Sequence, residues 1–325
     1  MLAGTLTPTQ ASEFVRVPTC ILKTLDKTQV DLFLQHSVSE PHVLYREANY
    51  PLAQDRALEL VQTCEETLFV RAKDYAQFSQ DLVDSLEAAL EDEMLSSGQR
   101  FELVQYAVSL EVEQSLRKVN CDSYVSSSQT IGRQIASLLD AGDTLPADLY
   151  GIVRHDFHTF VHVTNVAGYA TLLAKELSIS DSTELEKIAI GGLLHDMGKR
   201  HIPSSILTKT DPLTPGEWAI IKQHPQRGYE ELCHRSSLEH GQLMMVYQHH
   251  EHIDGMGYPV GAIGEELHPW AKMLAVVDVF DALTGQRPYR NPMTRGQATE
   301  FLLSRAGTQF DKEIVQCWAS AMQKN

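Results

Sequence analysis

Residues 249–259 read HHEHIDGMGYP, so three histidines and a carboxylate occupy four positions and are followed by Gly-x-Gly-Tyr-Pro. Imidazole is a mediocre helix former and is not usually buried without a partner. Twelve of the fourteen histidines in the chain lie between His155 and His268. Because neutral imidazole is a common metal ligand, this clustering favours a metal centre in the second half of the chain.

The composition is that of an ordinary soluble protein, long enough at 325 residues for two domains. No apolar run approaches the roughly 20 residues of a membrane span, and the N-terminus lacks a signal-peptide pattern. The five cysteines form no CxxC pair, which indicates reduced thiols and a cytoplasmic protein. A formal charge of −16 argues against binding polymeric nucleic acid or an acidic membrane.

The pattern along the chain predicts a mainly α protein, an all-α bundle preceded by a small α+β domain. Short β-type runs at 14–22, 30–35, 42–47 and 67–72, with a helical run at 55–65, place the α+β domain at residues 1–80. Residues 81–123 read as an acidic helical linker, which would suit a homodimer. Residues 124–325 read as helix almost throughout, and LTPGEW (213–218) carries a capping box with Thr214 at the N-cap.

Several ligand-type residues fall at expected helix ends or inside apolar runs. His195 and Asp196 end an apolar helix, with Gly198 as its stop, and His224 precedes a proline expected to end another. A carboxylate can bridge two cations, so an adjacent His-Asp pair suits a centre with more than one metal. The set of candidate ligands comprises His162, His195, Asp196, His224, His249, His250 and Asp278.

Each candidate also has an ordinary interpretation. A single helical histidine is more often a hydrogen-bonded core or surface residue than a ligand. A His-Asp pair can arise by chance, and His155-Asp156 is interpreted as structural. Asp278 by itself would suit a cap or a salt bridge. The prediction therefore rests on the whole set, and the remaining histidines are assigned to ordinary surface or core roles.

These residues resemble a known family, the HD-GYP subgroup of the HD-domain metal-dependent phosphohydrolases. HDMGK at 195–199 is similar to the HD signature, and HHEHIDGMGYP matches HHExxxGxGYP at every defined position. The resemblance continues through IP (202–203), HP (224–225), VVDVFDALTGQRPYR (276–290) and GTQFDKEIV (307–315), and it spans about 155–320.

The resemblance implies an all-α bundle that hydrolyses cyclic di-GMP to pGpG, GMP or both. It also implies two divalent metal ions, iron or manganese. One would be held by His162, His195, Asp196 and Asp278, and Asp196 would bridge to a second held by His224, His249 and His250. Some members place a Glu one turn before the first ligating histidine to help hold a third metal. Here that position is His158, which disfavours a third ion.

By the same resemblance, Asp196 and Lys199 are catalytic, and Lys199 would contact the scissile phosphate or assist proton transfer. Arg287 and Arg290 would clamp phosphate, and Tyr258 would bond to or stack near the substrate. Within the opening stretch, Gly255 and Gly257 would let the backbone turn. Glu251 and Asp254 are expected to orient the ligand imidazoles.

Two alternatives remain open at this point. In the first, the enzyme acts on another cyclic dinucleotide, such as cyclic GMP-AMP. The motifs do not separate these substrates, because they do not contain the residues that select the base. Otherwise the chain would be a cyclic di-GMP receptor without activity that signals to a partner through residues 1–80. Retention of every candidate ligand, Lys199 and Tyr258 favours an enzyme.

Overall fold

The computed structural model describes residues 13–17, 27–35, 40–51, 67–75, 77–78, 100–101, 103, 121–140, 146, 149–150, 159–207, 209, 211–285 and 291–324. The chain divides into two compact units, Met1–Leu95 and Ser96–Asn325. The boundaries expected at residues 80 and 123 adjoin segments outside this description and stay predictions.

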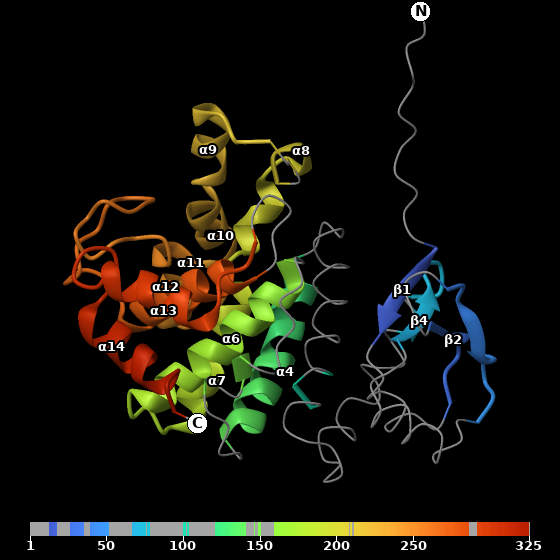
Figure 1. Cartoon of the computed structure of the whole chain (residues 1–325). Helices are drawn as coiled ribbons and strands as arrows, with labels where there is room; N and C mark the ends of the chain where they lie inside the picture. Colours follow the sequence, from blue (N-terminus) through green and yellow to red (C-terminus); the bar gives the residue numbers. More distant parts are fainter. Residues whose placement is uncertain are drawn as a thin grey trace, which may run out of the picture. The chain divides into compact units, whose positions relative to one another are not determined.

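The first unit contains a four-stranded antiparallel sheet in the order β1-β4-β2-β3 (Figure 1). Its strands are β1 (Phe14–Val17), β2 (Leu32–Gln35), β3 (Val43–Arg46) and β4 (Thr67–Arg71), one within each predicted β run. Leu32, Leu68 and Val70 are fully buried and form the core of this sheet. The helix expected at 55–65 lies outside the described residues.

The second unit is helical, which confirms the predicted fold class (Figure 1). Its elements are α4 (Cys121–Asp140), α6 (Thr159–Glu176), α7 (Ser182–Leu194), the 3₁₀-helix η2 (Met197–His201), α8 (Ser204–Leu207), α9 (Pro215–Ile221), α10 (His224–Leu232), α11 (His240–Gln248), α12 (Pro269–Thr284), α13 (Arg295–Ser304) and α14 (Lys312–Ala321).

The core of this unit is built on α6, α12 and the second half of α7, whose residues are mostly buried. Tyr169, Phe280 and Trp318 pack edge to face with ring centroids 5.0 to 5.7 Å apart. Helices α6 and α7 approach closely because α7 has a glycine at the crossing: a Cβ at Gly192 would lie 2.7 Å from Ala167 Cα. This close packing fixes the ends of the helices that carry the candidate ligands.

Two expected helix ends differ from the structure. Helix α7 ends at Leu194 and the chain continues into η2, so Gly198 does not stop the helix. Gly198 is needed for another reason, because a Cβ there would collide with the carbonyl oxygen of His224. Pro225 does not end a helix either. It lies in the first turn of α10, where its missing N–H costs nothing.

The capping box predicted at the start of α9 is present. Thr214 Oγ1 accepts the N–H of Glu217, and the Glu217 carboxylate accepts the N–H of Thr214. Among the described residues, no helix combines the length and apolar character needed to cross a membrane.

Candidate metal centre

The seven candidate ligands come from helix termini and one apolar helix that meet in the second unit. His162 lies in the first turns of α6, His195 caps the C-terminus of α7, and Asp196 follows it. His224 begins α10, and Asp278 lies within α12. His249 caps α11, and His250 follows it. The fold therefore gathers residues that are more than 110 positions apart in the sequence.

One group of ligand atoms forms around His162, His195 and Asp196, which lie within 4.8 Å of one another. The Nε2 atom of His162 is 3.1 Å from Asp278 Oδ1. The Nε2 atom of His195 is 3.6 Å from Asp196 Oδ2 and 3.9 Å from Asp278 Oδ1. Two imidazoles and two carboxylates thus point at one position.

The second group consists of His224, His249 and His250. The Nε2 atoms of His224 and His249 are 3.2 Å apart. Asp196 Oδ1 lies 3.3 Å from His224 Nε2 and 3.9 Å from His249 Nε2, while its Oδ2 faces the first group. Asp196 therefore presents one oxygen to each group, as a carboxylate bridging two cations must.

Backbone carbonyls hold three of these imidazoles from behind. The Nδ1 atom of His195 lies 2.6 Å from the carbonyl oxygen of Gly192, and that of His224 lies 2.8 Å from Ile221. His249 Nδ1 lies 3.0 Å from the carbonyl oxygen of Val246. Each contact favours the proton on Nδ1, which leaves the Nε2 lone pair directed at the centre.

The arrangement fits a divalent metal. His195 Nε2 and Asp196 Oδ1 are buried without a hydrogen-bond partner, which is costly for polar atoms. The facing Nε2 atoms of His224 and His249 cannot both donate to each other. A cation would satisfy all of these lone pairs, and a nitrogen and oxygen donor set suits iron, manganese or zinc.

The carboxylates of the centre are held ionised. Burial raises the pKa of Asp196, but Lys199, His195 and His224 lower it further, so that it lies well below its usual range. Asp278 shows the same competition, and the pKa is lowered chiefly by its hydrogen bond to His162. The Lys199 ammonium contacts Asp196 Oδ2 directly.

The imidazoles divide into two kinds. Burial lowers the pKa of His195 and His249, and it lowers that of His250 to about 3. These rings are neutral at pH 7, the form that binds metal. Burial also lowers the pKa of His162, but hydrogen bonds to Asp278 and Asp281 outweigh it and raise the pKa to about 9.

Asp281 is a functional residue that the sequence reasoning missed. Its Oδ2 accepts a hydrogen bond from His162 Nδ1 at 2.7 Å, and its Oδ1 accepts one from Asn165 Nδ2 at 2.8 Å. Asp281 is buried and lies one helical turn after Asp278. A second aspartate three positions on in the same apolar run was the signal available in the sequence.

The structure also brings Tyr258 to the centre. Its ring lies 4.8 Å from the His250 ring at an angle of 30°. Burial raises the pKa of the Tyr258 hydroxyl, so this group is a hydrogen-bond donor at neutral pH. Arg287, Arg290 and His158 lie outside the described residues, and their expected roles stay predictions.

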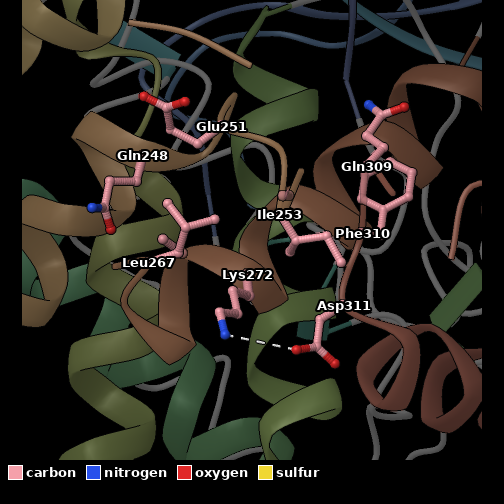
Figure 2. Close-up of a pocket in the computed structure, with 10 residues that line it drawn as sticks. Gln248, Glu251, Ile253, Leu267, Lys272, Gln309, Phe310 and Asp311 are labelled. Carbon is pink, nitrogen blue, oxygen red and sulfur yellow. Dashed lines mark ion pairs between the residues drawn. The ribbon is translucent and has the colours of Figure 1, made fainter. Parts of the chain in front are cut away.

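The loop after the histidines turns as expected at Gly255, which has φ +78°. Gly257 lets the loop pack closely against the backbone of Glu251, because a Cβ at Gly257 would lie 2.5 Å from Glu251 Cα. Behind the loop, Ile253 N–H donates to the Gln309 carbonyl and Asp254 N–H to that of Thr308. Figure 2 shows Glu251, Ile253 and Gln309 around a small cavity at this contact.

Glu251 and Asp254 do not orient the imidazoles, contrary to expectation. The buried Glu251 carboxylate accepts the N–H groups of Val260, Gly261 and Ala262 at 2.8 to 3.2 Å. Asp254 accepts the N–H of Met256. Both carboxylates shape the loop that carries Tyr258, because a loop with few packing contacts needs acceptors for its backbone donors.

The family model described as "HD domain" matches residues 149–314, which include all seven candidate ligands. The chain belongs to the HD-domain family. Its signatures at 195–199 and 249–259 assign this HD domain to the HD-GYP subgroup.

Three curated relatives are similar to about half of the chain. The "cyclic di-GMP phosphodiesterase response regulator RpfG" of Xanthomonas campestris is 37% identical over 53% of this chain and 46% of its own. The Pseudomonas aeruginosa "cyclic di-GMP phosphodiesterase PA4108" is 33% identical over 54% and 43%. The Vibrio cholerae "3'3'-cGAMP-specific phosphodiesterase 2" is 37% identical over 49% and 30%. The chain thus spans less than half the length of each relative.

One solved structure shares the fold. It is titled "Bd1817, a HDG"Y"P protein from Bdellovibrio bacteriovorus" and superposes with a TM-score of 0.66 over 96% of this chain and 100% of its own. At 17% sequence identity this similarity concerns the fold alone.

Proposed function

We propose that this HD-GYP protein is a metal-dependent phosphodiesterase that hydrolyses cyclic di-GMP to pGpG, GMP or both. The observation that carries the proposal is the position of Asp196, whose two oxygens face two separate groups of histidines. The names of two similar relatives, both cyclic di-GMP phosphodiesterases, supply the substrate.

We propose two divalent ions, iron or manganese, as cofactors. The first would be held by His162, His195, Asp196 and Asp278, and the second by Asp196 with His224, His249 and His250. When bound, the two ions lower the pKa of water and neutralise charge on the phosphoryl oxygens. His158 in place of a Glu supports two ions rather than three, because an imidazole cannot bridge metals.

The side chains around the ions complete the proposed reaction. Lys199 lies beside Asp196 and can neutralise a phosphate oxygen or hand a proton to the leaving oxygen. Tyr258 can donate its hydroxyl proton in a hydrogen bond to the substrate. Arg287 and Arg290 would hold phosphate through charged hydrogen bonds.

A second substrate is favoured by one specific observation. A Vibrio cholerae relative has the same 37% identity to this chain as RpfG, and it carries the name 3'3'-cGAMP-specific phosphodiesterase. The reacting bond is a phosphodiester in both cyclic dinucleotides, so the metal centre serves either. The receptor alternative is less well supported, because the described part of the site retains every candidate ligand.

The decisive experiment is hydrolysis by the intact chain, purified without oxygen and loaded with iron or manganese. Products from cyclic di-GMP and from cyclic GMP-AMP are followed by chromatography. We expect pGpG or GMP, and no product from the His195→Ala/Asp196→Ala variant, whose metal content should also fall. A large preference for cyclic GMP-AMP would overturn the assignment of cyclic di-GMP as the substrate. Full binding of cyclic di-GMP without turnover would favour the alternative of a receptor without activity.

The remaining features of the proposal concern the whole protein. The described cysteines Cys121, Cys233 and Cys317 are free thiols, which supports the proposed cytoplasmic location. A homodimer, a signalling partner reached through residues 1–80, and the absence of membrane or polymeric nucleic-acid binding stay predictions.

A further inference from the structure

Lys222 lies beside the candidate metal centre without belonging to any motif discussed above. Its ammonium nitrogen is 5.4 Å from the centroid of the Tyr258 ring, and that ring lies 4.8 Å from the His250 ring. In the part of the chain that the structure describes, Lys222 forms no ion pair with a carboxylate. It is therefore a positive charge held over an aromatic ring that contacts the second histidine group.

Lys222 shares a helix face with an exposed tryptophan. It caps α9, and its N–H donates to the carbonyl of Trp218 at 3.0 Å, so the helical geometry extends through both residues. Side chains four positions apart on a helix lie on the same face. Trp218 is 47% exposed, which is unusual for the largest apolar side chain.

This face belongs to a helix whose position is tied to the metal centre. Helix α9 ends at Ile221, three residues before His224, and lies beyond α10 at the edge of the helical unit (Figure 1). The contact between the Lys222 ammonium and the Tyr258 ring places the Lys222 end of this face beside the centre. One turn of helix thus carries a cation that contacts Tyr258 and, four positions earlier in the chain, an exposed aromatic side chain.

We propose that Trp218 and Lys222 form a substrate-binding face, on which Trp218 stacks a nucleobase and Lys222 binds the phosphate that is not being cleaved. The inference rests on the proposed function, because a cyclic dinucleotide carries two bases and two phosphates. The metal centre engages only the reacting phosphate. A tryptophan face binds any base by stacking, and an ammonium binds phosphate as a point charge.

The strong negative charge of the chain explains why such a cation matters. A dianionic substrate is repelled at long range by a net charge of −16. Lysine residues near the centre can make the local electrostatic potential positive. Lys199 is already paired with Asp196, whereas the Lys222 ammonium lies over an uncharged ring and pairs with no carboxylate among the described residues.

A spectroscopic experiment tests the stacking directly. Trp218 is 47% exposed, whereas Trp270 is 9% and Trp318 is 0% exposed, so a bound base can quench chiefly Trp218. The probe is a phosphorothioate analogue of cyclic di-GMP, which resists hydrolysis, added to the manganese-loaded protein. We expect tryptophan fluorescence to be quenched in the natural protein and not in Trp218→Phe. Persistent quenching in that variant would overturn the stacking role.

Steady-state kinetics test both residues. We expect Trp218→Ala and Lys222→Ala to raise KM for cyclic di-GMP about tenfold with little change in kcat. Trp218→Phe and Lys222→Arg should restore most of the affinity, because they keep a ring and a charge. Matched controls are Leu303→Ala on α13 and Lys312→Ala on α14, exposed residues of similar character.

The outcomes separate this inference from the proposed function. If the natural protein hydrolyses cyclic di-GMP and both alanine variants keep its KM within about twofold, a difference too small for a stacked base, the α9 face is not a binding face. If the natural protein hydrolyses neither cyclic dinucleotide, yet the analogue quenches Trp218, the proposed reaction fails and the binding face stands. A fall in kcat alone would indicate a disturbed metal centre and would also count against the inference.

Discussion

At the scale of single residues, the candidate centre depends on contacts that leave no room for additional atoms. At Gly198, η2 lies against the start of α10, and a Cβ would collide with the carbonyl oxygen of His224 and lie 2.6 Å from Gly228 N. This contact sets the distance between Asp196, which precedes η2, and His224. The absence of a side chain at Gly198 therefore helps to hold the Asp196 carboxylate near His224.

Gly198→Ala should consequently destabilise the fold and weaken metal binding. Overpacking of this kind costs about 1–3 kcal/mol, and the forced shift would move Asp196 away from His224. Thermal unfolding and elemental analysis of the purified variant measure the two effects. Gly216→Ala on α9 is the control, because no atom lies within 4 Å of a Cβ there. Equal metal content in both variants would contradict the role of the contact.

Asp281→Asn tests the carboxylate behind His162. Asp281 meets His162 Nδ1 and Asn165 Nδ2 with two separate oxygens, and in Asn one of these oxygens is replaced by an NH2 group that cannot accept. Loss of such a carboxylate behind a ligand typically lowers metal affinity about 10- to 100-fold. Titration with a competing chelator measures this affinity. The exposed Asp211→Asn is the control, and an unchanged affinity in Asp281→Asn would refute the positioning role.

At the scale of elements, α9 shows how local sequence fixes a short helix beside the centre. A seven-residue helix is marginal on its own, and its start is secured by the Thr214–Glu217 capping box and by the pair between Lys209 and Glu217. The bond to Lys209 and the N–H of Thr214 together lower the pKa of Glu217 to about 2. The helix end is therefore stabilised by an ionised carboxylate.

The stabilisation by Glu217 should depend on pH in a defined direction. Its folded pKa lies below the ordinary value of 4.5, so the stabilisation is complete above pH 4.5 and is lost as the pH falls toward 2. Glu217→Gln keeps the cap but not the charge. We expect a lower Tm for this variant at pH 7 and convergence with the natural protein between pH 4.5 and 2. A difference in Tm that does not change with pH would show that the charge of Glu217 is not involved.

At the scale of the whole molecule, every described candidate ligand lies in the second unit, Ser96–Asn325. That unit has its own core around Tyr169, Phe280 and Trp318. The described residues of the sheet unit contribute no candidate ligand to the centre.

The fragment Ser96–Asn325 should therefore bind metal and hydrolyse the substrate at a rate comparable to that of the full chain. Circular dichroism establishes that the fragment is folded, and product chromatography gives its rate. The same fragment carrying His195→Ala/Asp196→Ala is the control. A folded fragment that lacks metal would mean that residues 1–95 contribute to the centre.

Much of this protein could be predicted from local sequence. The four strands, the capping box at Thr214 and the helical second half follow from patterns within a few residues of one another. The seven candidate ligands could also be selected, because histidines and aspartates in apolar runs are chemically conspicuous. What local patterns could not give was the purpose of each glycine and carboxylate. Local patterns predict a helix stop at Gly198 and a support for the imidazoles in Glu251, and both predictions are wrong because these residues make their contacts with segments outside those patterns.

The sequence by itself determined which residues can bind metal and which segments are helical, because side-chain chemistry and helix periodicity are local properties. Only the tertiary structure decided which partners these residues meet. Asp281 reaches His162 across 119 positions, and Lys222 reaches Tyr258 from another helix end. Such contacts depend on how helices pack, and packing is fixed by the fit of distant side chains rather than by neighbours in the chain.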